Sequence, residues 1–409
     1  MEPTAVLITG SGYGPTHPFH PPLRITPMRI PRKVVHQVRY AMIGVLAACV
    51  GVGFAHLVAA MLNPQSSPVL AIGATVIDLT PTPVKTWAIR TFGTADKPIL
   101  IGSVLLGTLA AAGLIGIIAQ RRRRLGIGLL ALLVVPVVAV VLLRPGLAVS
   151  DLLPALAAVM IAPATLAILT RPRIIAPEGT TTTSRRGFLI GSGVALTLAA
   201  VAAGTGEWIR VVKQRISDIV LPRAATPLPD LPKGLSGVST FTTVNEKFYR
   251  VDTKLAVPVV DHTSWSLTID GQVDQKLTIS YADLLAMPMV EKDITLTCVS
   301  NEVGGPYVGA ARWLGVPLGD LLDRVGVRDG ADQILSTDVD GFTISTPLDV
   351  ATDGRDALIA VGMNGEVLPR KNGFPARLVV PGIYGFVGAT KWLTRMTLTT
   401  YAAEQAYWT

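Results

Sequence analysis

The chain has 409 residues, of which 50% are hydrophobic and 16% are charged, values outside the usual range of soluble globular proteins. Its two cysteines exclude a disulfide framework and a four-cysteine metal site. The net charge of +8 comes mainly from Arg and Lys beside apolar segments, with no basic stripe interleaved with aromatics, so no nucleic-acid partner is expected. A membrane protein is the first expectation.

The first part of the chain predicts a tail followed by a helical bundle. Residues 1–40 are rich in Pro, Gly and Thr and predict a flexible cytoplasmic tail. Residues 41–206 predict an all-α transmembrane bundle of about five helices, because about 20 apolar residues suffice to cross a bilayer. The expected spans are residues 41–62, 99–119, 125–143, 149–169 and 188–206. A shorter apolar run at 69–79 predicts an interfacial or re-entrant segment.

Basic segments orient this bundle. Arg29–Arg39, Arg121–Arg124 and Arg171–Arg186 all fall on one side when five spans are counted. The positive-inside rule places that side in the cytoplasm. The sequence therefore predicts a multi-pass protein of the cytoplasmic membrane, with the lipid bilayer as a partner and the residues after Gly206 on the extracytoplasmic side.

The segment Ser184–Leu189 (SRRGFL) precedes the last span and resembles a twin-arginine export signal, which serves folded, cofactor-loaded proteins. The alternative is that Arg185 and Arg186 are ordinary positive-inside anchors. Within the spans, His56 stands alone, and one histidine cannot supply the two axial ligands of a b-type haem.

Residues 207–239 predict a linker, and residues 240–409 predict a soluble α+β domain. Short alternating runs separated by Gly, Pro and Asp turns predict strands, and helical patterns lie between them. The expected strands are residues 264–269, 294–298, 341–346 and 376–380, and the expected helices are residues 281–285, 318–325 and 347–351.

Four segments of this domain carry a family resemblance. They are Asn245–Arg250 (NEKFYR), Thr295–Asn301 (TLTCVSN), Met363–Gly382 (MNGEVLPRKNGFPARLVVPG) and Tyr384–Leu393 (YGFVGATKWL). In this order they resemble the molybdopterin-binding core of the sulfite oxidase and nitrate reductase family with its bacterial relatives. The third segment is the most specific, because a match of that length is hard to reach by chance.

The resemblance implies a Mo-molybdopterin cofactor, with Cys298 as the metal ligand and catalytic residue. A soft thiolate suits a soft, redox-active metal. Arg377 would supply a forked donor to the pterin phosphate, and glycines near residue 388 would let backbone amides approach an anion. The implied cofactor-binding residues are Asn245, Phe248, Tyr249, Arg250, Asp338, Asn372, Arg377, Gly388, Ala389, Thr390 and Lys391.

Simpler interpretations remain open from the residues themselves. A single cysteine at a strand end, such as Cys298, is often a small buried hydrophobic residue. Asp338 also fits an ordinary turn aspartate. A non-catalytic, membrane-anchored binding or assembly module that keeps the fold without metal is therefore the alternative to an enzyme.

The substrate expected from the sequence is neither sulfite nor nitrate. Glu302, Val303 and Gly304 stand where sulfite-oxidising members carry arginines, and a carboxylate there would repel an oxyanion. The expectation is a molybdenum-dependent oxidoreductase that exchanges an oxygen atom or two electrons with a small-molecule substrate, by sulfoxide reduction or by oxidation of a sulfur compound. A quinone or a separate cytochrome would be the electron partner.

Overall fold

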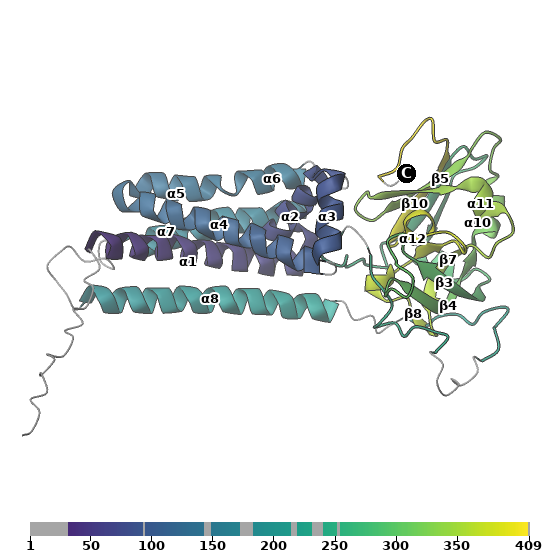
Figure 1. Cartoon of the computed structure of the whole chain (residues 1–409), viewed down its shortest axis with the longest axis horizontal. Coiled ribbons are helices and arrows are strands. Elements are labelled where there is room, and N and C mark those ends of the chain that lie inside the picture. Colours follow the sequence, from purple (N-terminus) through teal and green to yellow (C-terminus); the bar gives the residue numbers. More distant parts are fainter. Residues whose placement is uncertain are drawn as a thin grey trace, which may run out of the picture.

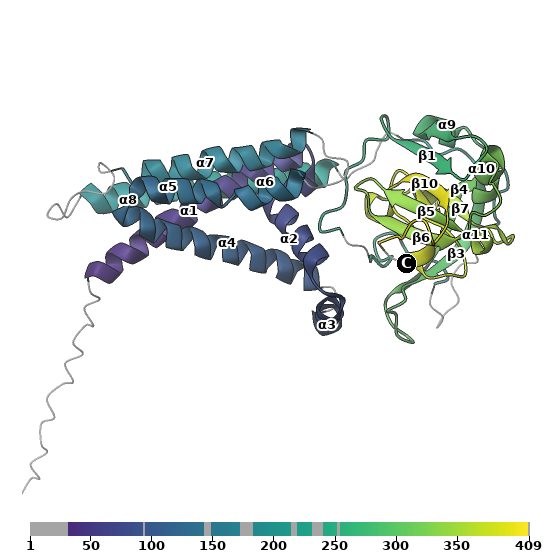
Figure 2. The same cartoon turned by 90° about the horizontal axis from the view of Figure 1, so that it is seen from above.

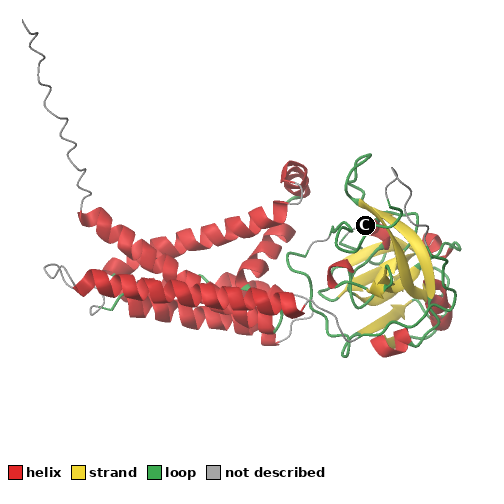
Figure 3. Cartoon of the chain, turned by 90° about the horizontal axis from the view of Figure 1, so that it is seen from below, coloured by secondary structure: helices red, strands yellow, loops and turns green. Residues whose placement is uncertain are grey.

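The computed structural model describes residues 32–92, 95–142, 149–171, 183–213, 219–230, 240–251 and 254–407. A helical bundle and a soluble domain lie end to end along the long axis of the molecule (Figure 1). In the described residues every strand belongs to the soluble domain, as the colouring in Figure 3 shows. The helical bundle and the soluble domain are therefore distinct parts of the described chain.

The bundle contains helices of very different length. Its elements are α1 (Arg32–Met61), η1 (Pro64–Ser66), α2 (Pro68–Leu79), α3 (Thr82–Phe92), α4 (Asp96–Arg121), α5 (Arg123–Leu132), α6 (Val135–Leu142), η3 (Val149–Leu152), α7 (Leu153–Leu169) and α8 (Thr183–Lys213). Pro136 lies in the first turn of α6, directly after the break that separates it from α5, a position where the missing proline amide costs no helical hydrogen bond.

Five segments of the described chain are long and apolar enough to cross a membrane: Lys33–Met61, Asp96–Arg121, Arg123–Leu142, Val149–Leu169 and Gly187–Ile209. They coincide with the five spans expected from the sequence. The helices extend further than the apolar runs, since α1 begins inside the expected tail and α8 continues past Gly206. Residues 1–31 of the expected tail lie outside the described residues.

The long helices pack through small residues. Gly44 on α1 and Gly116 on α4 face each other so closely that a Cβ at either position would overlap the backbone of the other helix. Small residues allow such an approach between membrane helices. Helix α1 is central, because it contacts α4, α7 and α8.

The two ends of the bundle differ in chemistry. At the end remote from the soluble domain, the Arg39 guanidinium lies 4.7 Å from the centre of the Phe188 ring, and Arg123 Nε donates to Thr170 Oγ1 at 3.1 Å. At the other end, Asn63 Nδ2 donates to Asp151 Oδ1 at 3.1 Å. Figures 1 and 2 show α2 and α3 at this second end, next to the soluble domain.

The soluble domain contains two five-stranded sheets. The first has the order β2-β1-β10-β5-β6, with β1 (Ser266–Gly271), β2 (Leu277–Ser280), β5 (Gln333–Asp338), β6 (Thr343–Pro347) and β10 (Leu393–Thr399). The second has the order β3-β4-β7-β8 with β9 paired to β7, and comprises β3 (Val290–Thr297), β4 (Val308–Pro317), β7 (Leu358–Met363), β8 (Glu366–Val367) and β9 (Arg377–Val379). Strands β1 and β10 are parallel, whereas the other pairs are antiparallel.

Short helices join these strands, namely α9 (Tyr281–Leu285), α10 (Leu318–Val325), α11 (Leu348–Thr352), η4 (Arg370–Asn372) and α12 (Gly385–Gly388). Helix α9 begins with a capping box between Ser280 and Asp283, which satisfies two amides at the helix start. Helix α10 ends at Gly326 with φ of 64°, a left-handed conformation that favours glycine. These two helices confirm the predicted ranges. Core side chains of both sheets pack into one apolar cluster, and further side chains of β3, β4, β7 and β9 form a second cluster with Phe248.

Candidate functional site

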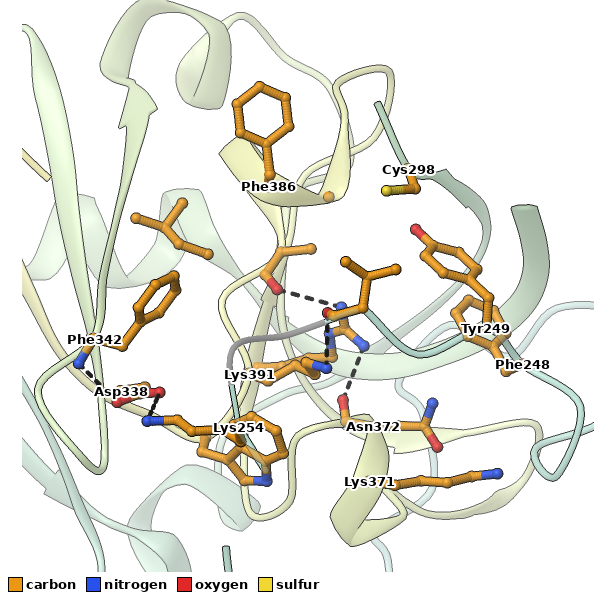
Figure 4. Close-up of a pocket in the computed structure, with 16 residues that line it drawn as sticks. Phe248, Tyr249, Lys254, Cys298, Asp338, Phe342, Lys371, Asn372, Phe386 and Lys391 are labelled. Carbon is orange, nitrogen blue, oxygen red and sulfur yellow. Dashed lines mark hydrogen bonds and ion pairs between the residues drawn. The ribbon is translucent and has the colours of Figure 1, made fainter. Parts of the chain in front are cut away.

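A pocket lies where the two sheets approach each other at their ends (Figure 4). The loop before β1, the end of β3, the β5–β6 turn, η4, β9 and the segment from α12 to β10 contribute to its wall. These elements are distant in sequence, so the pocket exists only in the folded domain. Residues predicted from the family resemblance that line it are Phe248, Tyr249, Cys298, Asp338, Asn372, Arg377, Ala389 and Lys391.

Cys298 directly follows β3 and carries its thiol into the pocket wall. Its amide donates to the Tyr307 carbonyl at 2.9 Å, which holds the residue after the strand ends. The residue is 8% exposed, and its Sγ lies 3.1 Å from Ser300 Oγ. Figure 4 shows the sulfur turned toward the space between Phe386 and Tyr249. The thiol is thus buried in the chain yet faces a ligand-sized space.

An aromatic group lies beside this thiol. Phe248 and Tyr249 stack with ring centres 5.4 Å apart, and Phe248 meets Trp313 edge to face at 5.8 Å. Burial raises the pKa of Tyr249 to about 12, against the opposing effect of Arg377. The phenol is therefore neutral at physiological pH and can donate a hydrogen bond.

We expect Tyr249 to titrate well above an ordinary tyrosine. Because the neutral phenol is favoured in the folded state, its stabilising contribution is present below about pH 10 and is lost as the pH rises toward about 12. Tyrosinate absorbance should be compared between the unaltered chain and Tyr249→Phe during an alkaline titration. A difference spectrum with its midpoint near pH 10 would contradict the buried position.

Arg377 on β9 is the most constrained cation of the pocket. The residue is 6% exposed, and its guanidinium lies 5.1 Å from the centre of the Trp313 ring. It donates to the Asn372 carbonyl at 2.8 Å and to the Ala389 carbonyl at 3.3 Å. Arg377 therefore joins η4, β9 and the segment after α12 while it lines the pocket.

Two buried polar atoms near Arg377 have no hydrogen-bond partner among the described residues. They are Oδ1 of Asn372, which lines the pocket, and Oγ1 of Thr390. Both residues are at most 1% exposed. Because buried polar atoms in folded proteins are nearly always paired, Oδ1 of Asn372 favours a polar ligand in the pocket that supplies its missing partner.

Positive charge dominates the pocket lining. Lys254, Lys371, Arg377 and Lys391 contribute side chains, and Asp338 is the acidic residue among the described lining residues. Lys254 Nζ lies 2.8 Å from carboxylate oxygens of both Asp338 and Asp340. Burial opposes the charged amine, but the two carboxylates outweigh it and raise the pKa of Lys254. An anionic ligand would be favoured here.

Four of the predicted cofactor-binding residues do not line the pocket, namely Asn245, Arg250, Gly388 and Thr390. Asn245 donates to the Met363 carbonyl at 3.2 Å and to Glu366 Oε2 at 2.9 Å, so its amide supports the protein frame. The amide of Gly388 bonds within α12 to the Tyr384 carbonyl. That amide is therefore not directed at an anion, unlike the arrangement expected from the sequence.

The remaining lining residues were not selected from the sequence. They are Val251, Lys254, Phe342, Ile344, Lys371, Gly385, Phe386 and Trp392. Lys371, Gly385, Phe386 and Trp392 lie inside the family-like segments, so their position in those motifs was an available signal. Lys254 had no such signal, since only the fold brings it to Asp338. Glu302 is exposed and lies outside the lining.

Comparison with protein families identifies this domain. Residues 254–408 match the family described as "Oxidoreductase molybdopterin binding domain". The pocket fits a molybdopterin on physical grounds, since a buried thiol, excess cationic side chains and an unsatisfied amide oxygen face the same space. The cationic side chains can bind the phosphate of such a ligand, and the thiol can bind its soft metal. The cofactor of the domain is Mo-molybdopterin.

Individual proteins are also similar to this chain. Mitochondrial sulfite oxidase of Drosophila melanogaster is 34% identical over 182 residues, covering 39% of this chain and 31% of that protein. Sulfite oxidase of Gallus gallus is 33% identical over 183 residues, covering 39% of each. The chain thus spans less than half of the length of either protein. The uncharacterized oxidoreductase YuiH of Bacillus subtilis is 32% identical over 139 residues, covering 34% of this chain and 67% of that protein.

A solved structure is also similar. The sulfane dehydrogenase SoxCD from Paracoccus pantotrophus shows 26% identity and a TM-score of 0.34, covering 38% of this chain and 42% of that chain. The family model covers the three motif segments that follow residue 254, and the identity to YuiH and the pocket chemistry agree with it. The chain therefore belongs to the sulfite oxidase family of molybdopterin-dependent oxidoreductases.

Proposed function

We propose that this chain is a membrane-anchored molybdenum-molybdopterin oxidoreductase that transfers an oxygen atom or two electrons to or from a small substrate on the outer face of the cytoplasmic membrane. The observation that carries the proposal is the buried Cys298 thiol, which faces a pocket lined by four cationic side chains. A cysteine that only fills space in a protein core is inert and needs no cationic side chains around it.

Different pocket residues would bind different parts of the cofactor. Cys298 would ligate molybdenum, while Arg377, Lys371 and Lys391 would neutralise the phosphate of the pterin. The Asn372 amide oxygen would accept a hydrogen bond from the pterin ring. When bound, the cofactor supplies the exchange of an oxygen atom and two electrons, and the protein supplies orientation and charge.

The chemistry near the thiol favours a small organic sulfur compound as substrate. Phe248, Tyr249 and Phe386 contribute aromatic surface to the pocket that Cys298 lines, which suits the apolar groups of an organic sulfur compound. Reduction of a sulfoxide to a sulfide consumes two electrons and two protons and releases one water molecule. A quinol can supply both electrons and both protons, and sulfide oxidation is the reverse reaction.

The bundle supports an extracytoplasmic position for the domain. Arg39 and the run Arg121–Arg124 lie at the end remote from the domain, against Lys85 and Lys97 at the end next to it. By the positive-inside rule that end is cytoplasmic. On this basis residues 32–213 form the membrane anchor and the domain from residue 240 onward lies outside, where a quinone or a separate cytochrome would exchange electrons with it.

Metal analysis tests the proposal directly. Protein purified in detergent from a host that makes the cofactor should contain about one molybdenum per chain, as ligation by one cysteine requires. It should also reduce a sulfoxide with a quinol analogue, or oxidise a sulfide in reverse. Folded, metal-free protein from such a host would refute the enzyme and leave the non-catalytic module. Activity with reduced cytochrome alone would assign the electron partner to a cytochrome.

A further inference from the structure

The turn between α1 and α2 reaches the soluble domain. Gln65 Nε2 donates to Asp340 Oδ2 at 2.7 Å, although the two residues are 275 positions apart. The turn is itself held, because the Gln65 amide donates to Asn63 Oδ1 at 3.1 Å and Asn63 Nδ2 donates to Asp151 at 3.1 Å. The bundle therefore presents Gln65 to the domain from a constrained turn.

Asp340 connects Gln65 to a lysine of the pocket wall. The same carboxylate oxygen that accepts from Gln65 lies 2.8 Å from Lys254 Nζ, which also pairs with Asp338. The Asp340 side chain is 31% exposed, whereas those of Lys254 and Asp338 are 9% and 2% exposed. Gln65 thus contacts the more exposed of the two carboxylates that pair with a pocket lysine.

Two further contacts join the bundle to the same side of the pocket. Lys97 Nζ at the start of α4 donates to the Lys254 carbonyl at 3.2 Å. Lys85 on α3 lies 5.8 Å from the centre of the Tyr407 ring, and this ring lies 5.0 Å from that of the pocket residue Phe342. Three elements at one end of the bundle therefore support the wall formed by Lys254 and Phe342.

We propose that the membrane bundle completes the cofactor pocket, with Gln65 acting as a positioning residue that holds Lys254 in place through Asp340. Without the amide donor, Asp340 can turn to water and Lys254 loses one of its two anchors. Retention of an anionic cofactor then weakens although no pocket residue has changed. This inference rests on the proposed function in one respect, namely that the anion bound in the pocket is the cofactor.

Acylation of lysine amines tests, without any cofactor, whether Gln65 holds Lys254 in place. In the full chain in detergent, Gln65→Leu and Gln65→Glu should raise the acylation rate of Lys254 about tenfold, the effect of losing about 1.4 kcal/mol from a hydrogen bond to a carboxylate. The exposed Lys276 serves as an internal standard in the same digest. Gln275→Leu is the matched control, because Gln275 makes a side-chain hydrogen bond to the Arg324 carbonyl outside the pocket.

Molybdenum retention tests whether the position of Lys254 affects binding of the cofactor. Gln65→Glu sets a carboxylate against Asp340, so cofactor should be lost on dialysis about tenfold faster than from the Gln275→Leu protein. Asp340→Asn by itself should also speed the loss, since it removes the carboxylate through which Gln65 holds Lys254. Unchanged Lys254 labelling would overturn the inference, as would increased labelling with undiminished retention. If the unaltered chain holds no molybdenum, the proposed function fails and the labelling result alone decides this inference.

Discussion

Cys298→Ser is expected to reduce turnover at least about 100-fold, because even the outer partners of metal ligands are worth about 10- to 100-fold. A serine hydroxyl is a harder ligand with a much higher pKa than a thiol, so it suits a soft metal poorly. The substitution changes one atom in a buried position, and the fold should persist. Turnover and the thiolate-to-metal absorption band should be measured together.

The chain offers a matched control for this substitution. Cys49→Ser alters the second cysteine of the chain, which lies on α1 of the bundle. It should leave turnover, metal content and the absorption band unchanged. If Cys298→Ser retains the band and the activity, ligation by this cysteine is wrong.

Arg377→Met is expected to remove the cofactor and to destabilise the soluble domain. The buried guanidinium satisfies the Asn372 and Ala389 carbonyls and lies over Trp313. Loss of these charged hydrogen bonds costs about 3 kcal/mol, which lowers the midpoint of thermal unfolding by about 10 °C in a domain of this size. Calorimetry and molybdenum analysis on the same preparation would measure both effects.

A conservative change should fail at this position as well. In Arg377→Lys one ammonium replaces a planar fork that bonds two carbonyls in different directions. Arg328→Lys is the surface control, because Arg328 pairs with Asp274 where both side chains are at least 60% exposed, and such pairs contribute little. Equal thermal midpoints for the two lysine variants would contradict the structural role of Arg377.

Local patterns predicted the helices well. The five long helices were predictable because each is one long apolar run, the pattern that a segment able to cross a bilayer must have. Helices α9 and α10 were readable because the Ser280 cap and Gly326 bound them in the sequence. Strands β5 and β7 were not selected, because β7 is buried throughout and β5 nearly so, leaving no alternation to detect.

The residues of the candidate site were also only partly predictable from the sequence. Cys298, Asn372 and Arg377 were found because they lie in family-like segments, and the fold brings all three to one pocket. Their roles as ligands stay predictions. Asn245 belongs to such a segment too, yet its side chain bonds to Met363 and Glu366. Sequence position alone could not separate a ligand from a residue that supports the frame.

The sequence by itself determined the five long apolar helices, the α+β class of the soluble domain and the segments that bear the cofactor signature, because each depends on neighbours along the chain. The tertiary structure alone decided that Lys254 enters the pocket and that Gln65 of the bundle contacts Asp340. The physical reason is that buried charges are tolerated only where partners distant in the chain converge on them, and that convergence is a property of the complete fold.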